Sequence, residues 1–370
     1  MVTEPVILEI LVACTAAYTV QMILLYVGLN LSSRKPAPSA AEPMVSVIVA
    51  ARNEEEHIAR CVESLLRVDY PENKLEVIVV DDGSTDRTQE IVRSISSSSS
   101  RLKMIRATAG TGNLRGKANA LAQGIERSSG EMIMLTDADC EVRPGWVRNT
   151  LRYFNTKTGI VGGFTILKSK SMFEGIQCLD WMFLFGLASS AAGYGFPLTV
   201  IGNNFAFRKS CYEEAGGYQA IPFSVTEDYA LVRAIIRKTS YGVRFPLNPE
   251  NAVSSTACKT PRQLYRQKQR WGVGGLDMIL GGKLLMAVGW IARLALLALP
   301  IFAPWNLVLD AAILIALADL LFLWKPAVRF GKISSLAYFL PFEIYFTFYV
   351  LVLPFVAYFS KKVIWKERNL

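Results

Sequence analysis

Acidic residues gather at three places in the first half of the chain, and each group follows a short apolar run. The groups are Ala51-Arg52-Asn53-Glu54-Glu55, Asp81-Asp82-Gly83-Ser84-Thr85-Asp86 and Thr136-Asp137-Ala138-Asp139. Carboxylate oxygens bind hard divalent cations and also accept protons from a reacting hydroxyl. One Asp-rich turn alone is often only a helix cap or a turn. Three such groups together indicate a site built from carboxylates.

The triplet Asp137-Ala138-Asp139 has a spacing that suits a metal ion. It follows the apolar run 132–135, and alternate residues at the end of a strand place two oxygen ligands near each other. Mg²⁺ or Mn²⁺ shared with a substrate diphosphate prefers such hard ligands. Two aspartates at this spacing are common by chance, so the apolar run before them is what makes the triplet informative.

Catalytic chemistries that need histidine or paired cysteines find little support in the composition. The only histidine is His57, which argues against histidine triads and histidine-rich metal sites. The six cysteines are scattered singly with no C-x-x-C pair, which indicates buried thiols in a reducing compartment rather than zinc ligands or disulfides. Carboxylates must therefore carry most of the acid-base and metal chemistry.

Strand-like and helix-like segments alternate around the acidic groups. The expected strands are 45–50, 75–80, 102–106 and 131–136, and the expected helices are 55–67, 85–95 and 116–127. Such alternation predicts an α/β fold with a largely parallel sheet covered by helices. Ligands of these sheets bind beyond the carboxyl ends of the strands, and all three acidic groups fall there.

Two familiar nucleotide-binding motifs are absent or incomplete. No G-x-G-x-x-G follows the first expected strand, as a dinucleotide-binding fold would require. The segment from Gly112 to Lys117 is similar to a phosphate-binding loop, but it is one residue short and lacks the Ser or Thr that holds magnesium. Lys117 therefore has two interpretations, a contact to a phosphate or base and a solvated lysine at the start of a helix.

Apolar stretches flank the α/β region. Residues 10–29 are uncharged and long enough to cross a bilayer, and the preceding Glu4 and Glu9 argue against a cleaved signal peptide. Arg34 and Lys35 follow directly, which predicts an outer amino terminus and a cytoplasmic α/β region. Three later stretches, 284–303, 306–323 and 336–359, are also apolar. We therefore expect a membrane segment over 1–35, a catalytic domain over 36–282 and a membrane region over 283–370.

The number of crossings raises a conflict. Three crossings after a cytoplasmic domain would place the basic tail, with Lys361, Lys362, Lys366 and Arg368, outside the cell, against the distribution that positive charges usually adopt. We therefore expect one of the later stretches to be re-entrant or interfacial. The apolar segment 173–187 is also expected to be a helix that lies against the membrane.

The net charge of the chain indicates which classes of binding partner to expect. Forty Lys and Arg residues against 31 Asp and Glu residues give a net charge of +9, which favours anionic lipids or phosphorylated substrates. A nucleic-acid partner is not expected, because the chain has no long basic run and no basic-aromatic stripe.

An ordered set of motifs resembles that of the family 2 glycosyltransferases. The set comprises residues 47–55, Asp81-Asp82-Gly83-Ser84-Thr85-Asp86, Gly116-Lys117-Ala118-Asn119-Ala120-Leu121, Thr136-Asp137-Ala138-Asp139, Thr226-Glu227-Asp228 and Gln267-Lys268-Gln269-Arg270-Trp271. The resemblance implies the GT-A fold, with a mixed and mainly parallel sheet, and a reaction that inverts the anomeric carbon. It covers residues 44–271, and the ordered set is far more specific than any of its members.

The resemblance also implies roles for individual residues. It implies that Ala51, Asn53, Glu54 and Asp82 hold the nucleoside, usually uridine. Asp137 and Asp139 would hold the sugar diphosphate through Mg²⁺ or Mn²⁺, and Asp228 would be the general base. An inverting displacement needs one base and one cation but no protein nucleophile, which agrees with the composition. Glu227, beside Asp228 on the acceptor side, would help to keep that base ready to accept a proton.

Two interpretations apply to the basic stretch that ends at Trp271. An interfacial helix would place its Arg and Lys residues at lipid phosphates and Trp271 at the headgroup level. The family resemblance instead implies that Gln267 and Arg270 contact the diphosphate or the acceptor, and that Trp271 stacks on a sugar. Both interpretations are compatible with one helix.

The expected function is transfer of a sugar from a nucleotide donor, UDP-linked by the resemblance, to a lipid acceptor at the inner membrane. A processive polysaccharide synthase, with a growing glycan as acceptor, is the competing enzymatic hypothesis, although the membrane region looks small for it. A non-catalytic nucleotide-sugar-binding protein and a transporter are hypotheses from different classes, but transporters usually show membrane repeats. An oligomer is compatible with the sequence.

Overall fold

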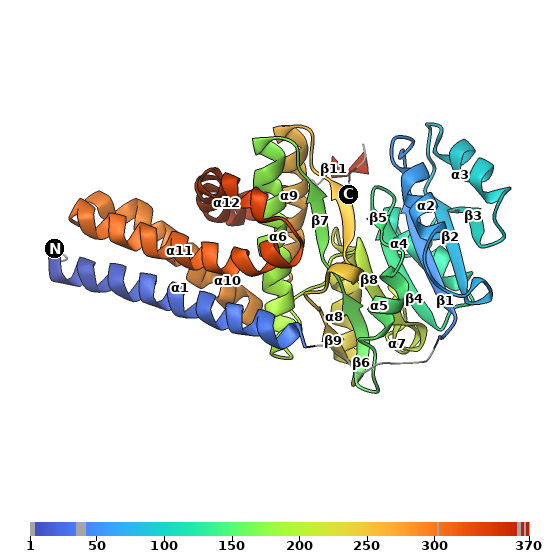
Figure 1. Cartoon of the computed structure of the whole chain (residues 1–370), viewed down its shortest axis with the longest axis horizontal. Coiled ribbons are helices and arrows are strands. Elements are labelled where there is room, and N and C mark those ends of the chain that lie inside the picture. Colours follow the sequence, from blue (N-terminus) through green and yellow to red (C-terminus); the bar gives the residue numbers. More distant parts are fainter. Residues whose placement is uncertain (1–3, 35–41, 302, 361–363, 366–367, 370) are drawn as a thin grey trace.

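The computed structural model describes residues 4–34, 42–301, 303–360, 364–365 and 368–369. An α/β part carries a group of long helices that extends away from it, and the first helix, α1 (Glu4–Ser32), begins at the far end of that group (Figure 1). The linker over 35–41 and the tail lysines Lys361, Lys362 and Lys366 fall outside the described residues. A short pairing of β11 (Ile364–Trp365) with β12 (Arg368–Asn369) ends the chain.

A seven-stranded sheet in the order β3-β2-β1-β4-β8-β6-β9 forms the centre of the α/β part. The strands are β1 (Val45–Ala51), β2 (Leu75–Asp81), β3 (Leu102–Arg106), β4 (Met132–Asp137), β6 (Thr158–Gly162), β8 (Asn204–Arg208) and β9 (Gly242–Arg244). Strands β3, β2, β1 and β4 are mutually parallel, and β8 runs antiparallel to β4 and β6. The expectation of a mixed, mainly parallel sheet is confirmed.

Alternation of side chains along the strands fills two cores. Val45, Val47 and Val49 of β1 pack with α2 (Ile58–Leu66), α3 (Thr88–Ser96) and α5 (Trp146–Leu151), whereas Ile48 packs with α4 (Gly116–Glu126) on the opposite face. Successive residues of a strand point to opposite faces, so a strand buried on both faces is a continuous apolar run.

Two helices begin later than the sequence predicts. Helix α2 begins at Ile58 rather than 55, and α3 begins at Thr88 rather than 85. The loop residues before them are tied to each other, because Asp86 Oδ2 accepts from the Glu55 amide at 3.0 Å and Asp86 Oδ1 accepts from the Thr88 amide at 3.0 Å. These bonds hold the acidic residues in loops at the strand ends.

Further elements complete the α/β part around the sheet. A small sheet has the order β5-β10-β7. Its strands and the remaining helices are β5 (Glu141–Val142), β7 (Thr165–Lys168), β10 (Val253–Thr256), α7 (Lys209–Glu214), α8 (Glu227–Lys238) and α9 (Pro261–Gly275). Helix α9 starts with a capping box between Thr260 and Gln263 and follows the small sheet directly.

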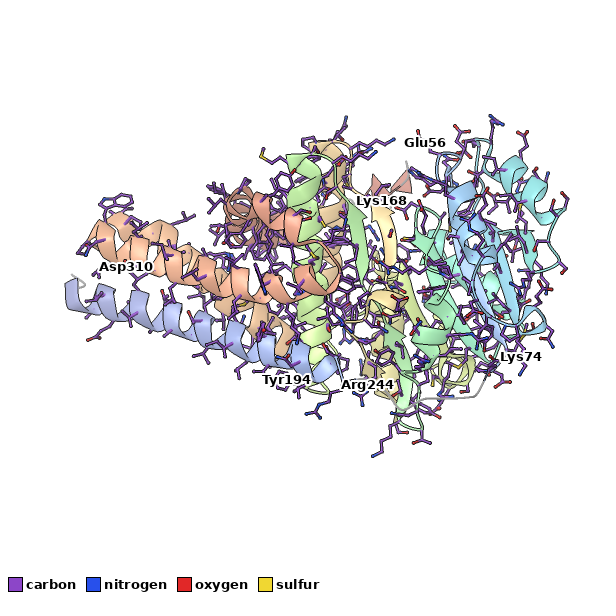
Figure 2. All side chains as sticks on the ribbon, viewed as in Figure 1. Glu56, Lys74, Lys168, Tyr194, Arg244 and Asp310 are labelled. Carbon is purple, nitrogen blue, oxygen red and sulfur yellow. The ribbon has the colours of Figure 1, made fainter. Side chains whose placement is uncertain are left out.

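Four segments of the described residues are long and apolar enough to cross a membrane, by length and composition. They are Leu8–Ser32 in α1, α10 (Leu280–Ala298), α11 (Trp305–Arg329) and Ile333–Phe359, which includes α12 (Phe339–Phe359). Helices α1, α10 and α11 run side by side and extend away from the α/β part (Figure 1). Asp310 lies near their far end, whereas Glu56, Lys74 and Lys168 lie on the α/β part (Figure 2).

Helix α6 (Met172–Gly193) confirms the apolar helix expected at 173–187, but its surroundings differ from the expectation. Most of its residues are buried inside the protein rather than turned to a bilayer, and it packs against α1, α11 and α12. A Cβ atom on Gly193 would lie 2.3 Å from the Gly28 carbonyl oxygen, so glycine lets α1 and α6 approach closely. The expectation of membrane contact along this helix is therefore wrong for most of its length.

Helix α12 differs in direction from the other long helices. It is viewed nearly along its axis in Figure 1, whereas α1, α10 and α11 lie across the view. Both of its ends contact helices α6 and α9. Tyr338, just before α12, packs on Gly175 of α6. Ser360, just after α12, accepts a 2.9 Å hydrogen bond from Gln269 of α9. Its outward residues are apolar, among them Leu340, Ile344 and Phe348.

Candidate active site

The strand register brings the three acidic groups to one edge of the sheet. Ala51 at the end of β1 pairs with Asp81 at the end of β2, and Ala50 pairs with Asp137 at the end of β4. Parallel strands with matched ends deliver the residues that follow them to the same edge. The predicted convergence of the first, second and third acidic groups is therefore present.

Lys117 joins two of the predicted motifs. It lies in the first turn of α4, and its Nζ is 2.6 Å from Asp137 Oδ1 and 3.1 Å from Glu227 Oε1. Burial lowers the Lys117 pKa, but the two carboxylates outweigh that effect and raise the pKa above its ordinary value. Lys117 is therefore charged and enclosed, and its interpretation as a solvated lysine is wrong.

Asp228 is a partly buried carboxyl group held by backbone amides. Its Oδ2 accepts from the Gly202 amide at 2.5 Å, and its Oδ1 accepts from the Tyr229 amide at 2.8 Å. Burial and the neighbouring charge of Glu227 raise the Asp228 pKa to about 6, while Lys117 and the two amides act in the opposite direction. A carboxylate with such a pKa accepts a proton near neutral pH more readily than an ordinary aspartate.

Asp139 lies in the same neighbourhood as Asp137. Its Oδ2 accepts from Ser255 of β10 at 3.0 Å. Burial raises the pKa of the Cys61 thiol, and the nearby charges of Asp139, Asp137 and Glu54 add to that rise, which places all three carboxylates around one buried side chain. Within the described residues no three His, Cys, Asp or Glu side chains form a set that could hold a metal alone.

The donor set at this strand end nevertheless fits a hard divalent ion. Asp137 and Asp139 offer carboxylate oxygens, and the Asp137 side chain is about one-third exposed at 34%, so it can face a ligand. Mg²⁺ and Mn²⁺ commonly use one or two protein carboxylates and take their remaining ligands from substrate phosphates and water. The carboxylate pair is suited to that arrangement.

The loops after β1 and β2 are fastened to each other. Asn53 adopts a left-handed φ of 52°, its amide donates to Ser84 Oγ at 3.1 Å, and its Oδ1 accepts from the Thr85 amide at 2.9 Å. Arg52 donates to the carbonyl oxygens of Asp82, at 2.6 Å, and of Gly83. Asn53 thus shapes the loops with its side chain, a role that its sequence position did not indicate.

The remaining nucleotide-side residues lie at the same strand ends. Ala51 closes β1, and its carbonyl oxygen accepts from the Asp82 amide at 2.8 Å. The Glu54 amide donates to Thr88 Oγ1 at 2.8 Å. Asp81, in contrast, is fully enclosed and accepts from the Gly83 and Ser84 amides and from Gln89, so it stabilises the turn.

Helix α9 reaches the site through Arg270. The Arg270 guanidinium donates to the Val225 carbonyl oxygen at 3.2 Å, in the loop that precedes Glu227. A small pocket of about 20 Å³ lies there, and its lining includes Arg115, Lys117, Phe223, Glu227 and Arg270. The predicted lysine, acidic and arginine motifs therefore border one pocket.

Gln267 and Trp271 occupy different positions on α9. The Gln267 Oε1 atom is buried without a hydrogen-bond partner among the described residues. Trp271 is half-buried, with its ring centroid 5.4 Å from that of Trp181 on α6. One side of the indole is therefore already packed against protein.

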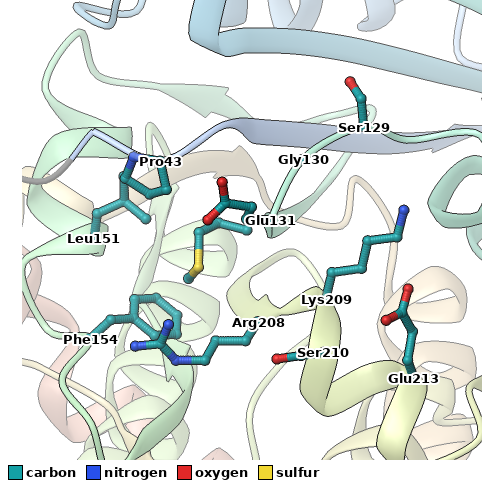
Figure 3. A pocket seen from close by; sticks show the side chains of 11 residues that line it. Pro43, Ser129, Gly130, Glu131, Leu151, Phe154, Arg208, Lys209, Ser210 and Glu213 are labelled. Carbon is teal, nitrogen blue, oxygen red and sulfur yellow. The ribbon is translucent and has the colours of Figure 1, made fainter.

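A larger cavity, of about 590 Å³, lies at the opposite edge of the sheet. Pro43, Gly130, Phe154, Arg208 and Lys209 are among its lining residues, and Figure 3 shows their side chains around it. These residues lie at the amino end of β4 and around the carboxyl end of β8, and they include none of the predicted site residues. Volume alone therefore does not locate the candidate active site.

Sequence reasoning missed several residues that shape the site. Gly202 binds the Asp228 carboxylate through its amide, and a Cβ atom there would lie 3.0 Å from Asp228 Oδ2. Ser255 holds Asp139, and Arg115 and Phe223 line the pocket. These contacts left no local sequence signal, because the Gly202 amide and the Asp228 carboxylate, for example, lie 26 residues apart in the chain.

An α/β sheet with carboxylates at its strand ends, joined to helices of membrane-spanning length, fits the architecture that the motif resemblance implies. The comparisons with known proteins agree. The model of glycosyl transferase family 2 matches residues 46–216, and that of glycosyl transferase family group 2 matches residues 132–361, more than half of the chain. The chain belongs to the family 2 glycosyltransferases, as the motif resemblance predicted.

Two curated relatives differ in the acceptors that their names give. The β-monoglucosyldiacylglycerol synthase of Synechocystis is 27% identical over 315 residues, covering 82% of this chain and 61% of that protein. The poly-β-1,6-N-acetyl-D-glucosamine synthase of Staphylococcus epidermidis is 28% identical over 240 residues, covering 64% of this chain and 55% of that protein. The chain thus spans somewhat over half the length of these relatives.

A solved structure shares the whole fold. The mannosyltransferase PcManGT from Pyrobaculum calidifontis, in complex with GDP-Man and Mn²⁺, matches with a TM-score of 0.62 at 21% identity. The match covers 96% of this chain and 99% of that one, so it includes the long helices as well as the α/β part.

Proposed function

We propose that this protein transfers a sugar from a nucleotide-sugar donor, UDP-linked, to a lipid acceptor in the membrane, with inversion at the anomeric carbon. The observation that supports this most is the position of Lys117 between Asp137 and Glu227, the residue that precedes Asp228. One largely enclosed lysine thereby connects a carboxylate of the donor side with the neighbour of the candidate base. Donor and acceptor would meet across a single pocket.

The strand-end loops would hold the donor. Ala51, Asn53, Glu54 and Asp82 would contact the nucleoside, and Lys117 and Arg270 would contact the diphosphate. Asp137 and Asp139 would hold Mg²⁺ or Mn²⁺, which neutralises the charge that develops on the departing diphosphate. The structure of the Pyrobaculum mannosyltransferase contains GDP-Man and Mn²⁺, which supports a nucleotide-sugar donor and a divalent ion, although its base is guanine.

Asp228 would accept the proton of the acceptor hydroxyl. The acceptor oxygen forms its bond to the anomeric carbon on the face opposite the diphosphate, so configuration inverts and no protein nucleophile is required. The Gly202 and Tyr229 amides orient the Asp228 carboxylate. The negative charge of Glu227 favours proton uptake by Asp228, while the positive charge of Lys117 lowers the Asp228 pKa.

The apolar helices beside the pocket support a lipid acceptor. Helix α12 turns a row of large apolar side chains outward, and α9, which carries Arg270, lies directly on it. Such an exposed apolar surface marks contact with a membrane or another partner. The Synechocystis relative, whose name specifies a glucosyldiacylglycerol product, matches 82% of this chain and favours the same acceptor class.

We also propose a topology in which α1, α10 and α11 cross the inner membrane and α12 lies at its cytoplasmic surface. Both ends of α12 contact the catalytic side, through Gly175 and Gln269, so it would not complete a crossing. Three crossings then return the chain to the cytoplasm, which agrees with the basic tail. The proposed domain division places catalysis in 36–282, between membrane regions 1–35 and 283–370.

Processive polysaccharide synthesis is the second candidate. The Staphylococcus epidermidis relative, named for a polymer product, supports it. Three crossing helices provide little material for a polymer channel, so this function would require an oligomer or a partner subunit. Product length separates the candidates.

The test uses the full chain in lipid nanodiscs containing native lipid extract, with Mn²⁺ and a panel of radiolabelled UDP- and GDP-sugars. The proposal predicts label in the organic phase, in a lipid that carries one added sugar. A ladder of products would support the polymer synthase. Nucleotide binding without transfer from any donor would contradict both.

A further inference from the structure

Helix α9 has two faces with different partners. Leu264, Lys268 and Gly272, spaced four residues apart, form its buried face. A Cβ atom on Gly272 would lie 2.7 Å from Leu353 Cδ1 of α12, so this face is seated closely on that helix. Residues four apart lie on one side of a helix, so the whole buried face turns toward α6 and α12.

The second face of α9 contacts the loop that carries the candidate base. Arg270 donates to the Val225 carbonyl oxygen, and a Cβ atom on Gly274 would lie 2.3 Å from Thr226 Oγ1. Thr226 directly precedes Glu227 and Asp228. Any shift or rotation of α9 would therefore move the Arg270 guanidinium and press on the loop at Thr226.

A buried ion pair fixes α9 against α6. Lys268 pairs with Asp180, and both residues are almost entirely enclosed, at 5% and 2% exposed. The Lys268 Nζ also lies 4.6 Å from the ring centroids of Trp271 and Tyr349. The pair thus connects α6, α9 and α12 at one point.

A buried ion pair of this kind contributes little net stability to the folded protein, so stability alone does not explain its presence. Removing two charges from water is costly, and apolar residues of similar volume in their place are often neutral or stabilising. An ion pair in contact with aromatic rings instead fixes direction and distance, because its energy depends strongly on geometry. The enclosed pair is therefore suited to holding α9 in one rotation.

We propose that Lys268 and Asp180 are positioning residues that set the rotation of α9, and through it the placement of Arg270 and the Thr226–Asp228 segment. The proposal rests on the proposed function, because its readout is sugar transfer. Neither residue lines the pocket, so the pair acts through its neighbours.

The test compares Lys268→Met and Asp180→Leu with the double variant Lys268→Met/Asp180→Leu. Each single variant leaves one buried charge without its partner and should lower the thermal midpoint. The double variant should recover most of that midpoint. Its kcat should remain about tenfold to a hundredfold below that of the parent protein, with little change in donor Kd, because small misplacements of catalytic groups have effects of that size.

A matched control, Arg293→Met/Asp319→Leu, removes a buried ion pair between α10 and α11. In the parent protein, Arg293 Nη2 lies 2.6 Å from Asp319 Oδ2. This control should keep the parent kcat. The proposal is overturned by a parental kcat in the folded double variant, or by an equal kcat loss in the control. If the double variant does not fold, Lys268→Arg decides, because its larger planar head should displace α9 and lower kcat, and an unchanged kcat overturns the proposal.

Failure of the proposed function gives a different result. In that case the parent protein itself transfers no sugar from any donor. The comparison of variants is made only after parental transfer has been measured, so the two failures remain distinguishable.

Discussion

At the scale of single residues, the proposed reaction depends on Asp228 as a partly buried base. Two backbone amides hold its carboxylate, and Glu227 and Lys117 set its charge environment. Asp228→Asn keeps the shape of the side chain but cannot accept the proton. We expect transfer to fall by about a hundredfold to ten-thousandfold, while calorimetry finds a donor Kd close to that of the parent protein. Substantial transfer by this variant would refute the assignment.

The pKa of Asp228 also predicts a pH dependence. Its value of about 6 lies above the ordinary aspartate value of 3.8. The base works only when deprotonated, so kcat/KM should be constant above that pH and decrease as the pH falls through about 6. An ordinary aspartate would sustain activity down to about pH 4. A profile measured with short lipid acceptors, with a midpoint near that lower pH, would contradict the structural environment described for Asp228.

Asp139 provides a separate prediction for the metal. Ser255 orients its carboxylate, so Asp139→Asn should keep the fold while replacing a charged oxygen ligand by a neutral amide. We expect the donor Kd to rise markedly in the presence of Mn²⁺ and to change little when EDTA is present. Titration of the nucleotide with and without metal measures the difference. Equal weakening under both conditions would show that Asp139 acts without a metal.

At the scale of elements, most of the α/β part was predictable from the sequence. Apolar runs such as 75–80 and 45–50 indicated the strands, because strands buried on both faces contain few polar residues. Helix starts were predicted three residues early at α2 and α3, because the acidic loop residues bond to each other instead of capping a helix. The predicted surroundings of α6 were wrong, since an apolar helix buried in protein and one facing lipid have similar composition.

The site was less predictable than the strands that carry it. The strand-end aspartates followed from position, but the contact between Gly202 and Asp228 did not. The same holds for the pairing of Lys268 with Asp180, whose residues are far apart in the chain. Such contacts depend on how loops and helices pack in three dimensions, and no local pattern encodes them.

The direction of α12 leads to a topology prediction. In a variant without the six native cysteines, a cysteine at Trp305, the exposed first residue of α11, should react with a membrane-impermeant maleimide from outside the cell. A cysteine at Ser360, beside Gln269, should react only after the membrane is opened. Labelling of both positions from outside would show that α12 completes a crossing.

At the scale of the whole molecule, the proposed function requires the fold to link a membrane surface to the carboxylates at the strand ends. Helix α6 is packed between the long helices and the sheet, and α9 lies between α12 and the loop before Asp228. Under the proposed function, a lipid hydroxyl would reach the pocket without leaving the membrane surface. The proposal would then account for the packing of apolar helices, which take no part in proton transfer, against the part of the fold that carries the carboxylates.

The central claim is that donor, metal and base share one pocket around Lys117. Electron cryo-microscopy of the protein in nanodiscs, with Mn²⁺ and a nucleoside diphosphate, tests it most directly. We expect metal density at Asp137 and Asp139, the diphosphate near Lys117 and Arg270, and the Asp228 carboxylate facing the same pocket. Nucleotide density elsewhere, such as in the 590 Å³ cavity lined by Lys209, would contradict it.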